Sequence, residues 1–291
     1  MLRVILFIAT NLAVMLLLTL VVKLTGIDVS TYSHGRINLV GLIILAGVIG
    51  MGGSFISLAM SKWIAKRSVG AQVIEQPRDA DETRLMDAIR RLAGEAGIGM
   101  PEVAIYDAPD MNAFATGMNR DNALVAVSTG LLRNMDRQQV EAVLGHEITH
   151  IANGDMVTMA LIQGVLNTFV IFLARVIGTV VDRMISGNRE GGGLAYFGIV
   201  IVLQIVLGLL ASIIVMAFSR WREFRADAGG ARLAGRESMI SALQRLAGNQ
   251  GENSLPKAIK AFGISDERGF ARLWMSHPPI AERIAALRVG H

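Results

Sequence analysis

His-Glu-Ile-Thr-His, at residues 146–150, is the stretch from which the chemistry and much of the architecture of this chain follow. It lies in a segment that begins near Arg137 and is expected to be helical, and positions four residues apart on a helix share one face. His146 and His150 would therefore present two imidazoles to one zinc ion, with Glu147 beside them as the general base. The expected reaction is peptide hydrolysis. The alternative is a solvated helix face that binds no metal.

A catalytic zinc ion needs a third protein ligand, which must come from another part of the chain. The sequence has no cysteine, so this ligand is a histidine or a carboxylate. The segment Arg222–Asp227 offers Glu223, with Asp227 one helical turn later, where it would orient a zinc-bound histidine through the free ring N–H. Composition alone favours equally a salt-bridged helix beside a membrane, in which neighbouring arginines pair with both carboxylates.

The composition predicts a membrane protein. Hydrophobic residues make up 52% of the chain, charged residues only 18%, and the mean hydropathy is +0.48. A hydrocarbon core about 30 Å thick needs roughly 20 apolar residues of helix. The stretches that approach or exceed this length are Val4–Val22, Leu39–Met60, Met156–Ala174 and Leu194–Ser219. We interpret the first as an uncleaved anchor; for the last two, a buried hairpin in a large soluble core is the alternative.

Basic residues at the ends of these stretches predict the orientation. Arg3 precedes the first stretch, and clusters of lysine and arginine follow the second and the fourth. The positive-inside rule therefore places both termini and the polar segments in the cytoplasm. The chain crosses the membrane twice between His150 and Glu223 and returns to the same side, which favours Glu223 as the third zinc ligand.

The expected fold class is a mainly α membrane protein with four transmembrane helices and a cytoplasmic α+β zincin-like metalloprotease domain. Residues 1–60 and 156–219 would each form two transmembrane helices, and residues 61–155 and 220–291 the two parts of the protease domain. Apolar spacing predicts an amphipathic helix over Asp81–Ala96. Other expected elements are strands at Val103–Tyr106 and Ala123–Val127, a turn-rich segment Asn112–Asn122 between them, and helices at Glu237–Leu246 and Ala281–Leu287.

The sequence resembles the HtpX family of bacterial membrane proteases, relatives of the CAAX prenyl proteases in the glutamate-zincin group. The matching segments are residues 112–117, 146–150 with 153–155, 219–227 and 276–279. The resemblance implies zinc ligands His146, His150 and Glu223, with catalytic Glu147. It also implies an integral inner-membrane location, a cytoplasm-facing active site, and degradation of misfolded or damaged membrane proteins under envelope or heat stress.

Three further residues are candidates on the strength of this resemblance. His277 and Arg283 would lie near the zinc ion and stabilise the tetrahedral oxyanion. The alternative is that two prolines start a helix whose Arg283 packs on the surface. Asn112 belongs to a segment that looks like the edge strand on which such proteases align a substrate, although an asparagine in a turn is equally ordinary. The segment Gly248–Gly269 matches the family pattern weakly, and no role is assigned to it.

Rival functions fit the sequence less well. An intramembrane protease is disfavoured by the polar residues that precede His146, which bilayer depth would penalise. A non-catalytic membrane chaperone or scaffold with a structural zinc ion is disfavoured by the intact Glu147 and by the lack of a fourth ligand. We expect one Zn²⁺ per chain, membrane-protein substrates and contact with the lipid bilayer. Nucleic acid is not an expected partner, because the basic residues gather beside apolar segments; homo-oligomer formation is left open.

Overall fold

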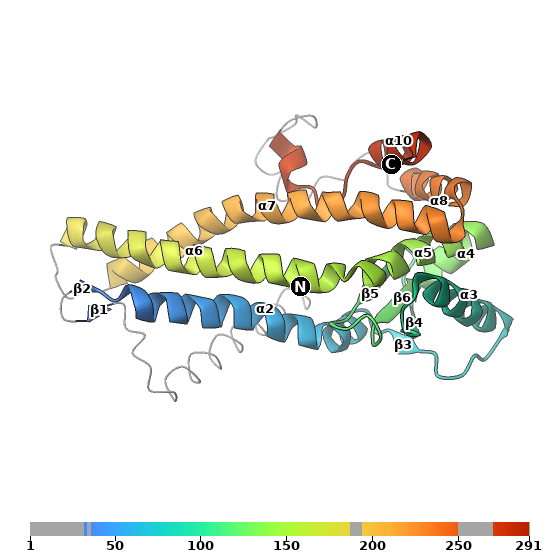
Figure 1. Ribbon diagram of the computed structural model, residues 1–291, viewed down its shortest axis with the longest axis horizontal. Coiled ribbons are helices and arrows are strands. Elements are labelled where there is room, and N and C mark those ends of the chain that lie inside the picture. The colour runs from blue at the N-terminus through green and yellow to red at the C-terminus, as the bar shows by residue number, and fades with distance from the viewer. Residues whose placement is uncertain (1–31, 34–35, 187–193, 250–269, 291) are drawn as a thin grey trace. The chain divides into compact units, whose positions relative to one another are not determined.

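The computed structural model describes residues 32–33, 36–186, 194–249 and 270–290. This part of the chain is mainly helical and contains one small mixed sheet (Figure 1). It forms two compact units. The first unit contains the described residues up to Ser57 together with Met159–Val215, and the second contains Leu58–Thr158 and the described residues from Met216 onward. The first predicted transmembrane stretch, Val4–Val22, lies outside the described residues.

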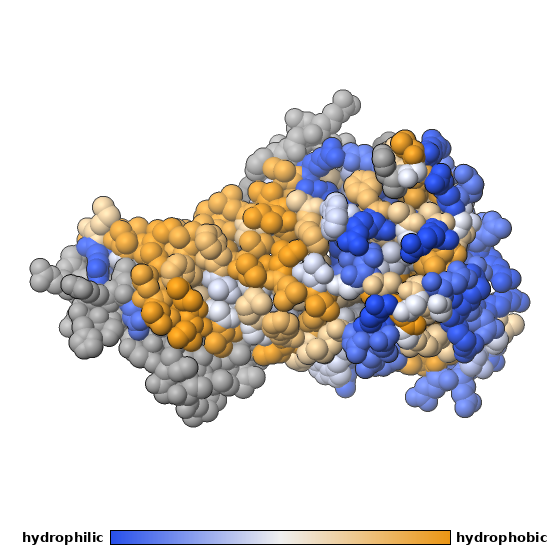
Figure 2. Space-filling view, viewed as in Figure 1, coloured by the Kyte–Doolittle hydropathy of each residue, from blue (hydrophilic) through white to orange (hydrophobic). Residues whose placement is uncertain are grey.

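Three of the described helices are long and apolar enough to cross a membrane. They are α2 (Leu39–Val69), α6 (Asp155–Ser186) and α7 (Leu194–Ala234). Only 6% of the apolar window of α6 and 11% of that of α7 is buried, so their large apolar side chains face outward. Figure 2 shows these side chains as an apolar surface. Such exposure suits lipid and contradicts the alternative of a hairpin buried in a soluble core.

Small residues allow the helices of the first unit to pack closely. A Cβ atom added to Gly164 of α6 would lie 2.7 Å from Sδ of Met51 in α2. A Cβ atom on Gly178 would lie 2.7 Å from Cγ2 of Val200, so α6 also approaches α7 closely. Such contacts are the usual means by which helices associate in a membrane. A two-stranded antiparallel ribbon, β1 (Tyr32–Ser33) and β2 (Arg36–Ile37), precedes α2.

The second unit contains a four-stranded sheet in the order β3-β4-β6-β5. Its strands are β3 (Gln72–Val73), β4 (Glu102–Tyr106), β5 (Ala113–Thr116) and β6 (Leu124–Ser128). β4 and β6 are parallel, the other pairs are antiparallel, and β5 is an edge strand. The turn-rich prediction for Asn112–Asn122 is wrong over β5, because pairing with the fully buried β6 holds this segment in a strand; the edge strand that the family resemblance implies for the Asn112 segment is present.

Helices cover this sheet and enclose the core of the second unit. They are α3 (Ala80–Ala96), α4 (Thr129–Asn134), α5 (Arg137–Asn153), α8 (Arg236–Asn249) and α10 (Ile280–Val289), with a 3-10 turn η1 (Phe270–Trp274). Leu144 and Ile148 of α5 are fully buried in one cluster with Ile89 of α3 and Leu243 of α8. The helix α5, which carries the His-Glu-Ile-Thr-His stretch, is thus fixed by core packing on several sides.

The ends of α5 follow from local sequence. Asp136 caps its N-terminus, and the Gln139 side chain returns a hydrogen bond to the Asp136 backbone, which completes a capping box. Gly154 ends it with a φ of 67°, a left-handed conformation that favours glycine. By contrast, α7 does not end where its apolar run does: it continues past Ser219 to Ala234 and so carries both Glu223 and Asp227.

Candidate metal centre

Glycines bring α5 and α7 together at the candidate site. A Cβ atom on Gly145 of α5 would lie 3.3 Å from Cα of Gly230 in α7, and one on Gly230 would lie 3.0 Å from the backbone nitrogen of His146. Gly229 lies directly against Thr149, where a Cβ atom would collide with the threonine side chain. The two backbones are therefore in contact at this level, and Glu223, about two turns earlier in α7, reaches the histidines of α5.

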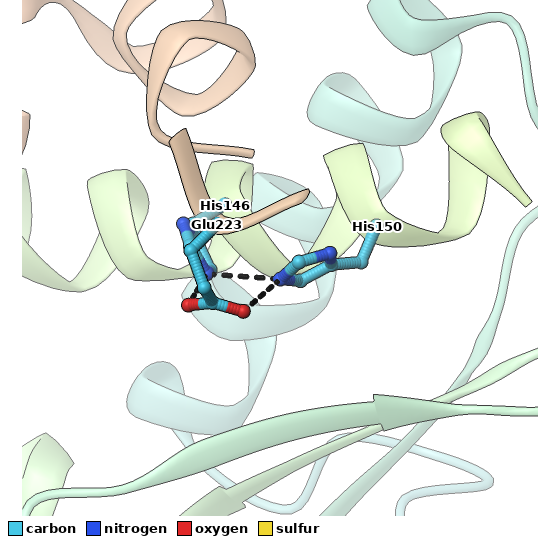
Figure 3. A group of neighbouring side chains, drawn as sticks. All are labelled: His146, His150 and Glu223. Atoms are coloured by element: carbon cyan, nitrogen blue, oxygen red, sulfur yellow. Dashed lines mark hydrogen bonds and ion pairs between the residues drawn. The ribbon is translucent and has the colours of Figure 1, made fainter. Parts of the chain in front are cut away.

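His146, His150 and Glu223 converge on one point, as Figure 3 shows. The Nε2 atoms of the two histidines are 3.1 Å apart. Glu223 Oε1 lies 3.3 Å from Nε2 of His150, and Oε2 lies 3.6 Å from Nε2 of His146. All three residues are buried, with exposed fractions of 7%, 6% and 1% in the order named.

These side chains fit a zinc ion. Ligands about 2.1 Å from a tetrahedral zinc ion lie about 3.4 Å from one another, close to the separations found here. Glu223 Oε1 is buried and has no hydrogen-bond partner in the described chain, which is costly for a carboxylate unless a cation completes the site. Two imidazoles and one carboxylate are also a donor set that zinc favours at catalytic sites.

Besides Glu223, each histidine has a carboxylate of its own close to its Nδ1 atom. His150 Nδ1 lies 2.6 Å from Asp155 Oδ2, and His146 Nδ1 lies 2.9 Å from Asp227 Oδ1, although the latter contact is not aligned as a regular hydrogen bond. With Nδ1 facing a carboxylate, each ring turns Nε2 toward the common point and is held in the tautomer that binds metal. Asp227 in turn accepts two hydrogen bonds from Arg283, at 2.6 and 2.7 Å.

The carboxylates also determine the protonation of the histidines. Burial is the largest influence on His146 and opposes its charge, but Asp227 and Glu223 together outweigh burial and raise the pKa of His146 to about 9. The pKa of His150 is raised as well, because Asp155 and Glu223 outweigh burial there. A metal that binds to the metal-free site must therefore displace protons.

The C-terminal candidates both reach the site. His277 Nδ1 lies 2.9 Å from Glu223 Oε2, and the side chain of His277 as a whole is 61% exposed. Arg283 is buried, which contradicts the alternative that it packs on the surface. Its guanidinium faces Asp227, with Nη1 3.7 Å from Glu223 Oε2. Burial opposes the charge of Arg283, but Asp227 outweighs it and raises the pKa of the guanidinium.

Glu147 faces the edge strand. Its Oε2 accepts a hydrogen bond of 2.9 Å from the backbone N–H of Ala115 in β5. It is the one residue between Ala142 and Ile151 that is not fully buried. Asn112, just before β5, forms two hydrogen bonds with Ser128 through its backbone. Its carbonyl accepts from the Ser128 N–H, and its N–H donates to the Ser128 hydroxyl. The exposed Asn112 side chain keeps its substrate-binding role as a prediction.

Sequence reasoning missed two parts of the site. Asp155 carried a signal, because it follows the glycine that ends α5 and lies five residues after His150, but no role was derived for it. The contact between Ala115 and Glu147 carried none, since a backbone N–H has no signature in the sequence.

Residues 79–289 match peptidase family M48. The chain belongs to peptidase family M48. This match spans well over half of the sequence and contains every residue of the centre described above. The chain is therefore a metalloprotease of this zinc-dependent family, with a buried metal site of His146, His150 and Glu223 that is consistent with zinc.

Similar M48 proteins extend the match to nearly the whole chain. Protease HtpX of Xanthomonas axonopodis pv. citri (strain 306) is 61% identical over 291 residues, which cover 99% of this chain and 97% of that protein. Protease HtpX of Stenotrophomonas maltophilia (strain R551-3) is 61% identical over 290 residues, or 99% and 98% of the two chains. These relatives confirm the resemblance to HtpX. With the three candidate spans, they also make this chain a multi-pass membrane protein.

A solved structure supports the fold. The crystal structure of S. mikatae Ste24p superposes on this chain with a TM-score of 0.62 at 19% sequence identity. The superposition covers 85% of this chain and 58% of the Ste24p chain, so this M48 protein spans a little over half the length of that one. At this identity the likeness concerns the fold alone.

Proposed function

We propose that this chain is an integral-membrane zinc endopeptidase that hydrolyses peptide bonds of misfolded or damaged membrane proteins at the cytoplasmic face of the bacterial inner membrane. One zinc ion per chain would be held by His146, His150 and Glu223. The observation that carries the proposal is the convergence of these three buried ligands beside Glu147, a partly exposed residue.

Glu147 is the general base in this proposal. Zinc bound at such a site supplies Lewis acidity, which polarises a carbonyl and makes water a nucleophile near neutral pH. Glu147 Oε2 is held by the Ala115 N–H, which leaves Oε1 to take a proton from the attacking water and to pass it to the leaving amine. The carboxylates of Asp155 and Asp227 keep both histidines in the metal-binding tautomer during these steps.

The substrate would lie along β5. Since the Asn112 carbonyl is bonded to Ser128, the backbone groups of Ala113 and Ala115 point away from β6, by the alternation of a strand. An extended substrate added at this edge would run past Glu147. His277, exposed and next to Glu223, is the side chain best placed to donate to the developing oxyanion. Arg283, which faces Asp227, acts in this proposal by positioning that carboxylate.

The cytoplasmic site in this proposal is supported by the charges that flank the spans, and the protease activity is supported by the relatives. α2 ends in the basic residues Lys66 and Arg67, and Arg220 and Arg222 follow the apolar run of α7. These charges favour the cytoplasmic side. The relatives from Xanthomonas axonopodis and Stenotrophomonas maltophilia are both named protease HtpX, and this chain matches them nearly end to end.

Casein cleavage in detergent tests the catalytic part. Wild-type protein is stripped of metal, restored with zinc and compared with Glu147→Ala and Glu223→Ala, with zinc content measured for each. We expect Glu147→Ala to bind zinc but not to cleave, and Glu223→Ala to lose zinc. Glu141→Ala, on the same helix but paired with Arg91 and Arg137 at the surface, is the control and should keep both properties. If Glu147→Ala cleaves casein normally, Glu147 is not the general base, and the alternative of a non-catalytic scaffold takes the place of the protease function.

Orientation can be tested independently because the chain has no cysteine. Cysteine is introduced at one of two positions: Met184, near the end of α6, or Glu95, on the exposed face of α3. In intact spheroplasts, a membrane-impermeant maleimide should label the first variant and should reach the second only after the membrane is permeabilised. The reverse pattern would place the active site outside.

A further inference from the structure

A set of polar side chains within the first unit has no part in the proposed reaction. It consists of Arg175 and Thr179 on α6 and Tyr196 on α7, which we call the polar set. Arg175 and Thr179 are four residues apart and share one face of α6. Thr179 is fully buried and Tyr196 is 6% exposed. Polar and charged residues are costly in a membrane-spanning helix, and those that occur there usually serve a function.

Each member of the polar set has a side-chain atom that lacks a partner. Arg175 Nη1, Thr179 Oγ1 and the Tyr196 hydroxyl are buried and form no hydrogen bond in the described part of the chain. Leaving such groups unpaired in a low-dielectric interior costs free energy, and nearly all buried polar groups have a partner. These atoms therefore need a partner that the described residues do not supply.

The three side chains lie close together because α6 and α7 are in contact there. A Cβ atom added to Gly178 would lie 3.6 Å from Cε2 of Tyr196, so the tyrosine ring packs against the α6 backbone next to Thr179. Ala174, the residue before Arg175, belongs to the same buried cluster as Tyr196.

The chemistry of the polar set points to an anion. A guanidinium can only donate hydrogen bonds, and tyrosine and threonine hydroxyls donate readily, so the ligand must be rich in acceptors. Arginine binds phosphate through two parallel hydrogen bonds and keeps its charge in any environment. A phosphate group carries enough acceptor oxygens for all three residues and balances the charge of Arg175.

The position along α6 identifies which phosphates are available. Residues 156–174 contain no charged side chain. Nineteen residues of helix span about 28 Å, roughly one hydrocarbon thickness, which places Arg175 at the level of lipid headgroups. Val180 and Phe197, both about half exposed, offer neighbouring apolar surface for acyl chains.

We propose that Arg175, Thr179 and Tyr196 form a binding site for the phosphate of an anionic phospholipid, which bridges α6 and α7. With the orientation proposed above this lipid belongs to the outer leaflet, but binding itself does not depend on the direction of insertion. The site is separate from the residues that carry out proteolysis.

Lipid retention by the full chain tests this site. Purified protein in detergent is titrated with phosphatidylglycerol and, in parallel, with phosphatidylcholine, and bound lipid is counted by native mass spectrometry. Inorganic phosphate is added as a competitor in a third arm. We expect one phosphatidylglycerol to bind in preference to phosphatidylcholine and to resist millimolar phosphate, because the acyl chains contribute to binding.

Variants assign the binding to the polar set. Arg175→Met should weaken phosphatidylglycerol binding on the order of tenfold, since it removes a charge-assisted pair, and Arg175→Lys should restore part of it. Thr179→Val and Tyr196→Phe, which remove only a hydroxyl group, should each weaken it severalfold. Arg90→Met makes the same charge change on exposed α3 and is the control. All variants should still cleave casein, which shows that they fold.

The results that overturn the proposal are distinct. If wild type and Arg175→Met retain phosphatidylglycerol equally, the lipid binds at other residues and not at the polar set. Displacement of the lipid by inorganic phosphate would reassign the site to a soluble anion. Failure of the wild type to retain any phospholipid would leave water as the partner of these atoms.

Discussion

The backbone N–H of Ala115, in an edge strand, donates a hydrogen bond of 2.9 Å to the carboxylate of Glu147, the proposed general base. This contact joins the strand along which a substrate would lie to the group that would move the proton. It also assigns the two oxygens of Glu147 different tasks, one fixed by the strand and one free for chemistry.

Ala115→Pro tests this contact, because proline has no N–H and is tolerated in edge strands. We expect kcat for casein to fall about tenfold or more, since one hydrogen bond that orients the base is lost. Zinc content should stay unchanged. Ala113→Pro removes the other N–H that points away from β6 and has no contact with Glu147, so it should raise KM and leave kcat nearly intact. A normal kcat in Ala115→Pro would show that the contact does not position the base.

Local sequence was sufficient for two of the three metal ligands. His146 and His150 are four residues apart on one helix, so their convergence needs no tertiary information. Glu223 is 73 residues beyond His150, and its place followed from an argument about membrane crossings. The structure adds the physical means, which is a contact between α5 and α7 at Gly145, Gly229 and Gly230. No periodicity rule identifies such a contact in advance.

Two elements depend on tertiary partners and not on local sequence alone. The strand β5 contains two alanines, a phenylalanine and a threonine beside a turn-rich stretch, and only its pairing with β6 makes it a strand. The apolar run of α7 ends at Ser219, but the helix itself extends to Ala234. It continues because the polar residues that follow, among them Glu223 and Asp227, find partners on α5 and α10.

Asp227, whose carboxylate faces Nδ1 of His146 and is bound by Arg283, should influence how tightly the site binds zinc. Asp227→Asn keeps the shape of the side chain but removes the charge that faces Nδ1 of His146, and Arg283→Met removes the group that positions Asp227. Each should lower zinc affinity about 10- to 100-fold, measured by competition with a chromophoric chelator. Arg272→Met, which breaks an exposed ion pair with Glu282, should leave affinity unchanged. Wild-type affinity in Asp227→Asn would contradict this role.

Asp155 should have the same importance for His150. Its Oδ2 lies 2.6 Å from His150 Nδ1 and the residue is 2% exposed, so Asp155→Asn replaces a buried charged acceptor with a neutral group. We expect a loss of zinc affinity of about 10- to 100-fold and, at saturating zinc, recovery of most casein cleavage. Asp87→Asn, an exposed carboxylate on α3 paired with Arg90, is the matched control. If saturating zinc restores no activity, Asp155 has a catalytic task beyond orienting the histidine.

The ion pairs of Glu102, which is not part of the metal site, should make the stability of the second unit depend on pH. It lies 2.7 Å from Nζ of Lys62 and 3.0 Å from Nζ of Lys66, which tie the C-terminal part of α2 to β4. The hydrogen bond from Lys62 is the largest influence and, despite partial burial, the lysines hold the pKa of Glu102 below its ordinary value of 4.5. A carboxyl group whose pKa is lower in the folded state stabilises that state fully above pH 4.5, and this contribution is lost as the pH falls through the folded pKa.

Glu102→Gln should therefore lower the thermal midpoint at pH 7, and the difference from wild type should disappear as the pH falls below the folded pKa of Glu102. Its side chain is 38% exposed, so solvent screens the pairs and the shift at pH 7 should be only about 2–4 °C. Glu95→Gln, which removes an exposed pair with Arg91 within α3, should change the midpoint less at every pH. A difference that persisted unchanged below the folded pKa of Glu102 would mean that Glu102 stabilises the unit by packing, because its carboxyl group is neutral under that condition.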